Sequence, residues 1–266
     1  MSRWKKGISR GLILFGIALL ILPFASGMVS RFQTDHLARR MKQEYSANRE
    51  ELEQIVEKAR VWNEQLATSN QAPAEEDAAY QSELCFYGEG IMGLISIDKI
   101  DVLLPIYHGC SDQVLSKGAG HLPSSALPIG SIGGRSLISA HSGSAMAELF
   151  TRLDELSIGD WFSIENPLER LDYQVVDIEI VTPEQTESLM PQEGEDLVTL
   201  ITCTPYGINS HRLLVTGKRG IRPEQHQEIS LFRSRRFWGL VLILTLAGFG
   251  GIRLVQSMKK RKKHES

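Results

Sequence analysis

The spacing of hydrophobic positions changes near residue 90 and divides the chain into two patterns. From Phe32 to Leu66, apolar residues recur at helical spacing between charged ones, which predicts an amphipathic helix. After residue 90, short apolar and β-branched runs alternate with turn residues, a pattern typical of a β-sandwich or closed β-barrel. The predicted strands are Met92–Ile97, Val102–Tyr107, Ser136–His141, Trp161–Glu165, Asp172–Val181, Val198–Thr202 and Arg212–Gly217, and the predicted short helices are Gln113–Gly118, Ala145–Leu156 and Glu184–Leu189.

Two uncharged apolar runs lie near the chain ends, Gly11–Val29 and Phe237–Ile252. Each is close to the length that spans a bilayer, and basic residues flank both outer ends. The positive-inside rule then predicts a cell-membrane protein with two spans, both termini in the cytoplasm and the middle of the chain extracellular. A cleaved signal peptide is the alternative for the first run, but its apolar stretch is longer than a usual signal core.

Charge is divided between the middle of the chain and its ends. Residues 32–232 carry 15 Lys and Arg against 31 Asp and Glu, although the whole chain has a net charge of only −3. Phosphate binding depends on clustered Lys and Arg, so this acidic middle region excludes a nucleic-acid partner. The chain also has no histidine–carboxylate cluster with zinc-site spacing and no cofactor-binding motif, so we expect neither a metal nor a cofactor.

Cysteines are few and odd in number: Cys85, Cys110 and Cys203. A secreted disulfide scaffold would carry a denser and even set. A Cys85–Cys110 bridge would leave Cys203 free, but we favour the interpretation that Cys85 and Cys110 are small apolar residues near the barrel.

The chemistry of the chain is concentrated around Cys203. The predicted strand Val198–Thr202 is broken by Pro205 and Gly207, so Cys203 is expected near the carboxyl end of a strand. The returning strand begins near Arg212, and a hairpin of this shape brings Arg212 back beside Cys203. A thiolate can attack an amide carbonyl, and a guanidinium can donate hydrogen bonds to the resulting oxyanion.

Residues 199–203 (TLITC), followed after a short loop by Arg212, resemble the signature of sortases, the cysteine transpeptidases of the Gram-positive cell surface. The fuller run through Asn209-Ser210-His211-Arg212 is similar to the class C branch, which assembles pili. Residues 95–108 are similar to the first two barrel strands of the family, and 136–151 to the block that carries its catalytic histidine. The resemblance implies a mainly-β fold, a closed eight-stranded sortase-type barrel with short helices, over about residues 90–220.

The chain offers four histidines within the predicted domain, and spacing alone does not choose among His108, His121, His141 and His211. The resemblance selects His141 as the general acid and base, with Cys203 as nucleophile and Arg212 as the oxyanion group. It also implies that Thr202 lines the substrate groove. His211 is the strongest rival from the sequence alone, and we expect it to be structural and to point away from Arg212.

The flank of His141 differs from the family pattern. It reads Ala140-His141-Ser142-Gly143 where sortases usually have Gly-His-Arg-Gly. We expect this difference to affect the conformation of the loop and the substrate preference more than catalysis. The segment before the barrel differs as well. Nothing between Asn70 and Gly90 matches the Asp-Pro-aromatic element of class C lids, so the protein either lacks this lid or uses an unrelated one around Glu83–Tyr87. Thr68–Tyr80 is acidic, and we expect a poorly anchored loop and an open cleft.

Together these features predict a membrane-anchored transpeptidase that cleaves an LPxTG-like sorting signal between threonine and glycine and transfers the acyl group to a pilin lysine. The alternatives are a housekeeping sortase that anchors surface proteins to cell-wall peptide, and a non-catalytic scaffold. The predicted organisation is a cytoplasmic N-terminus and first span (1–31), a helical segment and acidic loop (32–89), the catalytic barrel (90–220), a linker (221–236), and a second span with a basic cytoplasmic tail (237–266).

Overall fold

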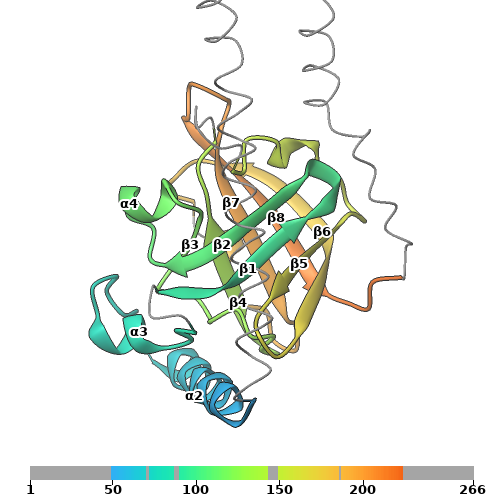
Figure 1. The fold of residues 1–266 in the computed structure, drawn as a ribbon. Coiled ribbons are helices and arrows are strands. Elements are labelled where there is room, and N and C mark those ends of the chain that lie inside the picture. The colour runs from blue at the N-terminus through green and yellow to red at the C-terminus, as the bar shows by residue number, and fades with distance from the viewer. Residues whose placement is uncertain (1–48, 70–71, 87–89, 143–148, 186, 224–266) are drawn as a thin grey trace, which may run out of the picture. The chain divides into compact units, whose positions relative to one another are not determined.

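A closed β-barrel forms most of the described structure (Figure 1). The computed structural model describes residues 49–69, 72–86, 90–142, 149–185 and 187–223. Within them the strands follow one another around the barrel in the order β1-β2-β3-β4-β7-β8-β6-β5. Their bounds are β1 Ile91–Ile97, β2 Val102–His108, β3 Ala119–His121, β4 Arg135–Ser139, β5 Trp161–Glu165, β6 Arg170–Val181, β7 Leu197–Thr204 and β8 His211–Arg219.

The predicted mainly-β, eight-stranded closed barrel is confirmed. The seven strands expected from the sequence all form, and Trp161–Glu165 has the expected bounds. The eighth, β3, was not predicted, because Ala119-Gly120-His121 is too short to show alternation. It is nevertheless needed for closure, because it pairs with β2 in parallel and with β4 antiparallel.

The short helices are shorter than the sequence suggests. The helix expected over Gln113–Gly118 is α4, Asp112–Leu115, and it begins at an N-cap where Ser111 Oγ accepts from the Val114 amide. Instead of a helix over Glu184–Leu189, the described residues form a 3₁₀ turn at Glu187–Leu189. The described part of the predicted Ala145–Leu156 helix likewise contains only the 3₁₀ turn Leu153–Glu155.

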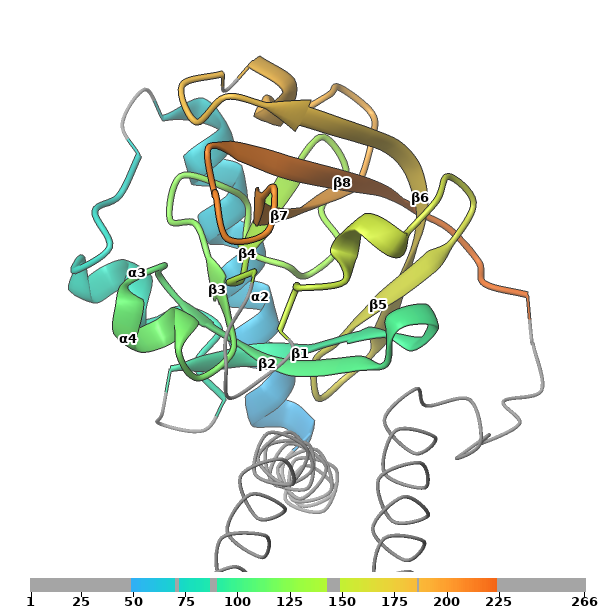
Figure 2. The same cartoon turned by 90° about the horizontal axis from the view of Figure 1, so that it is seen from above.

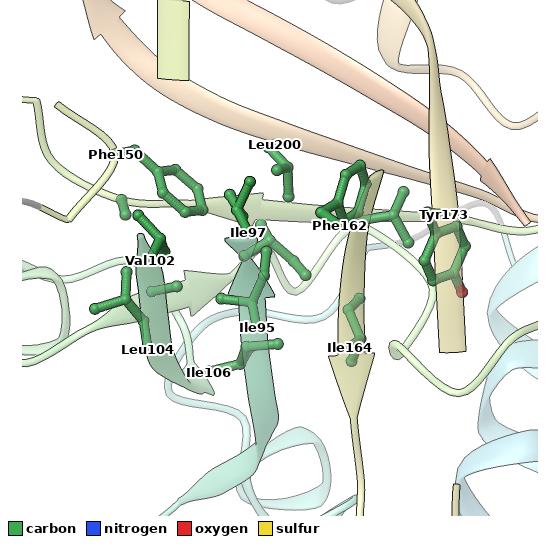
Figure 3. Packing of buried hydrophobic residues seen from close by; sticks show 14 of the residues in the cluster. Ile95, Ile97, Val102, Leu104, Ile106, Phe150, Phe162, Ile164, Tyr173 and Leu200 are labelled. Carbon is green, nitrogen blue, oxygen red and sulfur yellow. The ribbon is translucent and has the colours of Figure 1, made fainter. Parts of the chain in front are cut away.

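Alternate side chains of the strands point into the barrel and fill it. Isoleucine, leucine and valine from β1, β2 and β7 meet aromatic side chains from β5, β6 and the segment before Leu153, as Figure 3 shows. Burial of one such large side chain contributes roughly 1.5–3 kcal/mol, so this interior supplies the main stabilisation of the barrel. The residues labelled there are Ile95, Ile97, Val102, Leu104, Ile106, Phe150, Phe162, Ile164, Tyr173 and Leu200.

Helix α2, Arg49–Thr68, precedes the barrel and packs on it through one face. Its buried residues are Leu52, Val56, Ala59 and Asn63. Asn63 Nδ2 donates to Leu127 O at 3.0 Å, and Leu127 N donates to Asn63 Oδ1 at 2.7 Å. This paired contact fixes the helix along its axis. The predicted Phe32–Leu66 helix is thus found for its second part, and residues before Arg49 lie outside the described ranges.

The segment after α2 is better anchored than the sequence suggested. It contains helix α3, Ala78–Ser82, whose Tyr80 is fully buried. The Tyr80 hydroxyl donates to His121 O at 2.9 Å, accepts from Gly109 N at 3.0 Å and lies 3.0 Å from His121 Nδ1. The expectation of a loop without anchoring side chains is therefore wrong, because the one aromatic residue of Thr68–Tyr80 enters the core. Figures 1 and 2 show α2 and α3 at the end of the barrel opposite the β7–β8 turn.

The predicted two-span membrane localisation is contradicted. Across the ranges that the structure describes, no helix is both long enough and apolar enough to cross a bilayer. The long helix α2 fails this requirement because charged residues occur along most of its length. The runs 11–29 and 237–252, on which the prediction was based, lie outside the described residues. The terminal spans, and the topology derived from them, are therefore not retained.

The Tyr80 contacts predict a measurable contribution to stability. Tyr80→Phe should lower the free energy of unfolding by about 1–2 kcal/mol, because it removes the hydroxyl that bonds to His121 and Gly109 in a buried site. Urea denaturation followed by fluorescence measures this difference. The matched control is Tyr206→Phe, since Tyr206 is 68% exposed. Equal stabilities of the two variants would show that the Tyr80 hydroxyl does not anchor the segment.

Candidate active site

The β7–β8 hairpin places Cys203 and Arg212 on adjacent strands. The two residues are directly opposite in the antiparallel register, and Thr204 is opposite His211. The connecting turn is closed by two amides, those of Ile208 and Asn209, which both donate to Pro205 O at 3.0 and 2.9 Å. The hairpin predicted from the sequence therefore forms, and it returns Arg212 to the side of Cys203.

The strand that carries the histidine lies on the other side of β7. Strand β4 runs parallel to β7, with Ser139 opposite Ile201. Beyond the last strand pair, Ala140 N donates to Ile201 O at 3.1 Å, and Thr202 Oγ1 donates to Ala140 O at 2.9 Å. The same register continued by two residues would bring His141 beside Cys203, because neighbouring strands are about 4.8 Å apart. We refer to His141, Cys203 and Arg212 as the row.

This row lies on the outer face of the barrel. Ile138, Leu200 and Leu213 point into the main core, one from each of the three strands. Because side chains alternate along a strand, the row residues at the other parity face outward. All three are half-buried. A second, smaller cluster shares their face, formed by Leu137, Ile201 and Leu214 with Leu122, Val181 and Leu189 packed against it.

Arg212 is held at the hairpin by its own loop. Its Nη1 donates to Asn209 O at 3.2 Å and to His211 O at 3.1 Å. Both bonds use the same guanidinium nitrogen and hold the group against the backbone of the turn. A guanidinium has five donors, so others can reach an oxygen that develops negative charge beside Cys203.

Thr202 occupies a different position from the one the resemblance implied. It is buried, and its hydroxyl donates to Ala140 O inside the barrel. Its bond connects the strand of the cysteine to the residue just before His141. The structure therefore gives Thr202 a contact that sets the histidine strand, which sequence reasoning missed because the partners are far apart in the chain.

The other histidines in the described domain have structural environments. His108 Nδ1 and Nε2 meet the carbonyl oxygens of Gly90 and Glu83, and burial lowers the pKa of His108. Burial lowers the pKa of His121 to about 4, and its ring contacts Tyr80, Ser125 and Ala126 O. His211 contacts Ser210 Oγ at 2.8 Å and alternates with Arg212 along β8. None of these three joins the row.

Cys85, Cys110 and Cys203 are free thiols. Burial, together with the nearby charge of Glu75, raises the pKa of Cys110 to about 12. A thiol with so high a pKa stays protonated at neutral pH and is a poor nucleophile. Cys203, in contrast, is half-buried and lies opposite Arg212 in the strand register. The row thus consists of a thiol, an imidazole and a guanidinium, the kinds of group that acyl transfer through a thioester requires.

Comparisons with known proteins agree with this geometry. A family model described as the sortase domain matches residues 95–220. The structure resembles crystal structures of sortase C1 from Streptococcus agalactiae (38% identical, 68% of this chain and 96% of that one, TM-score 0.65) and sortase C from Streptococcus pneumoniae (37%, 71% and 99%, TM-score 0.65).

The sequence is also 30% identical over 130 residues to Sortase D of Bacillus subtilis, a match that covers 48% of this chain and 63% of that protein, less than two thirds of its length. The extent of the match to the solved class C enzymes, the family model and the arrangement around Cys203 all lead to one assignment. The chain belongs to the sortase family of cysteine transpeptidases.

Proposed function

We propose that this protein cleaves an LPxTG-like sorting signal between threonine and glycine and joins the threonyl group to a lysine amine of a pilin subunit. The proposal is carried by the pairing of Cys203 on β7 with Arg212 on β8, together with the β4–β7 register that leads toward His141 beyond the end of β4. Family membership does not by itself assign the substrate, the acceptor or the roles of the three residues, and these are the content of the proposal.

The row supports a two-step reaction. The Cys203 thiolate attacks the threonine carbonyl, and Arg212 donates hydrogen bonds to the oxyanion that forms. Protonated His141 gives its proton to the glycine nitrogen, the C–N bond breaks, and a thioester remains on Cys203. In the second step His141 accepts a proton from the lysine amine, which attacks the thioester and releases the Cys203 sulfur with formation of an amide.

A buried apolar cluster lies next to the row on the outer face. Leu137, Ile201 and Leu214 lie along the same face as Cys203, with Ile201 and Leu214 opposite each other in the next outward-facing register position. Leu122, Val181 and Leu189 pack against these three residues, which are buried. The cluster therefore supports the strand ends that carry the row and is not itself a surface for the donor peptide.

The preference for pilin rests on the class C relatives. The crystal structure of the pneumococcal sortase C gave insight into pilin substrate specificity, and 99% of that protein is covered at 37% identity. A second candidate acceptor is cell-wall peptide, which a housekeeping sortase would use. The two acceptors differ in their product, so one experiment separates them.

The acceptor is tested by product analysis. We expect purified protein, given a donor peptide with the LPxTG motif and equal amounts of a lysine-bearing pilin domain and a wall-peptide mimic, to form the lysine isopeptide about tenfold faster, a difference of about 1.4 kcal/mol in the barrier. Mass spectrometry identifies the linkage, and Cys203→Ala is the control. Faster joining to the wall peptide would instead identify a housekeeping sortase.

The role of His141 gives a second prediction. His141→Ala should lower turnover by roughly 10²–10⁴-fold, because the leaving amine and the attacking amine both need proton transfer. His211→Ala should retain activity within about threefold, since that imidazole lies off the row. Peptide cleavage kinetics measure both, with circular dichroism as the folding control. The opposite ranking would show that the histidine of the same hairpin is the catalytic one.

A further inference from the structure

A set of hydrogen-bonded polar side chains crosses the outer face of the barrel on the strands that lead to the row of His141, Cys203 and Arg212. Arg135 Nη1 donates to Thr199 Oγ1 at 3.0 Å, and Thr199 Oγ1 lies 2.9 Å from Thr216 Oγ1. These residues are 4%, 0% and 7% exposed, so all three side chains are withdrawn from water. Nothing in the two-step reaction described above uses them.

The three residues lie on the strands that carry the row. Arg135 is on β4 with the segment leading to His141, Thr199 is on β7 with Cys203, and Thr216 is on β8 with Arg212. The residue numbers of each network residue and its row partner differ by an even number, so both side chains face the outside of the barrel. Thr199 and Thr216 are directly opposite in register, and Arg135 reaches them diagonally from its place beside Leu197.

The first hydrogen bond of this network has a fixed direction. A guanidinium only donates, so Thr199 Oγ1 accepts from Arg135, whereas either hydroxyl can be the donor between Thr199 and Thr216. Burial lowers the pKa of Arg135, while the negative charges of Asp177 and Glu179 oppose that effect, and an arginine stays charged in any case. Asp177 and Glu179 come from the neighbouring β6, where they pair with Thr216 and Leu214.

Burying a cation and two hydroxyls is costly unless their bonds are kept, so this arrangement resists displacement of any of the three strands. Backbone pairing sets the register of the three strands, and these buried side-chain bonds add a further restraint on their spacing. A misplacement of about 1 Å at reacting groups can cost on the order of 10²-fold in rate. The hydrogen-bonded residues lie on the same three strands and the same face as the row, so a restraint at this point would act on the reacting groups.

We propose that Arg135, Thr199 and Thr216 form a positioning network that fixes the spacing of β4, β7 and β8 and thereby the mutual placement of His141, Cys203 and Arg212. The inference rests on the proposed function for the roles of those three residues. The network gives a role to Thr199, the first residue of the TLITC run, which takes no part in the acyl-transfer steps themselves.

Steady-state kinetics on a sorting-signal peptide test the network. Thr199→Val and Arg135→Met should each lower kcat about tenfold or more with KM changed less than about twofold, because geometry and not binding is lost. Thr199→Ser and Arg135→Lys keep a hydroxyl and a cation and should recover most of kcat. The double variant should be no slower than the slower single one, as expected for residues that act as a unit.

Lys218→Met is the matched control. Lys218 is a cation on β8 of the same outer face, but it is exposed and pairs with Glu195 outside the network. Its loss should leave kcat unchanged. Additive effects in the double variant, or an equal loss in Lys218→Met, would overturn the proposal.

A second measurement needs no substrate. The rate at which iodoacetamide alkylates Cys203, followed across pH by mass spectrometry of its peptide, depends on the placement of His141 and Arg212. Thr199→Val should change this pH profile, and Thr199→Ser should restore it. If the variants lower only the melting temperature, with kcat and the alkylation profile of the folded protein unchanged, the network is purely structural and the proposal fails.

The alkylation result also separates the two levels of the account. If no sorting-signal peptide is cleaved by the wild-type protein while Thr199→Val still alters the profile, the proposed function is wrong and the network is supported. If cleavage depends on Cys203 but the profile and kcat are indifferent to Thr199, the function stands and the network does not.

Discussion

The register of three strands is the constraint on which this site depends. Strand β7 is paired in parallel with β4 and antiparallel with β8. The second pairing sets Arg212 beside Cys203, and the first directs the segment with His141 to the other side of β7. A shift of either pairing by one residue would turn one member of the row to the other face of the sheet. The arrangement of these side chains therefore depends on the register of the backbone pairing.

The two faces of these strands have different tasks. The inner face carries Ile138, Leu200 and Leu213 into the barrel core, which holds the strands in place. The outer face carries the row, the smaller apolar cluster and, in our proposal, a buried hydrogen-bonded chain that keeps the spacing constant. Helices α2 and α3 lie at the end of the barrel opposite the β7–β8 turn, and their packing supports the fold (Figure 1).

Local pattern was enough to predict the parts of the structure that local sequence determines. Alternation located seven strands, and the turn residues Pro205 and Gly207 predicted the hairpin that pairs Cys203 with Arg212. The choice of His141 needed the resemblance to sortases, because β4 and β7 are joined by a parallel pairing between residues some sixty positions apart. For the same reason the bonds of Thr202 to Ala140 and of Arg135 to Thr199 could not be predicted. Tyr80 was missed because a single aromatic residue in an acidic loop has no periodic signal.

The most direct test of the account is the detection of a covalent intermediate. The full chain is mixed with a peptide carrying an LPxTG motif, quenched in acid and analysed by intact mass and peptide mapping. We predict an acyl adduct that ends at the threonine and is located on Cys203, that hydroxylamine removes and that Cys203→Ala does not form. Cleavage of the peptide without an adduct on Cys203, or an adduct located on Cys85 or Cys110, would contradict the central role of the row.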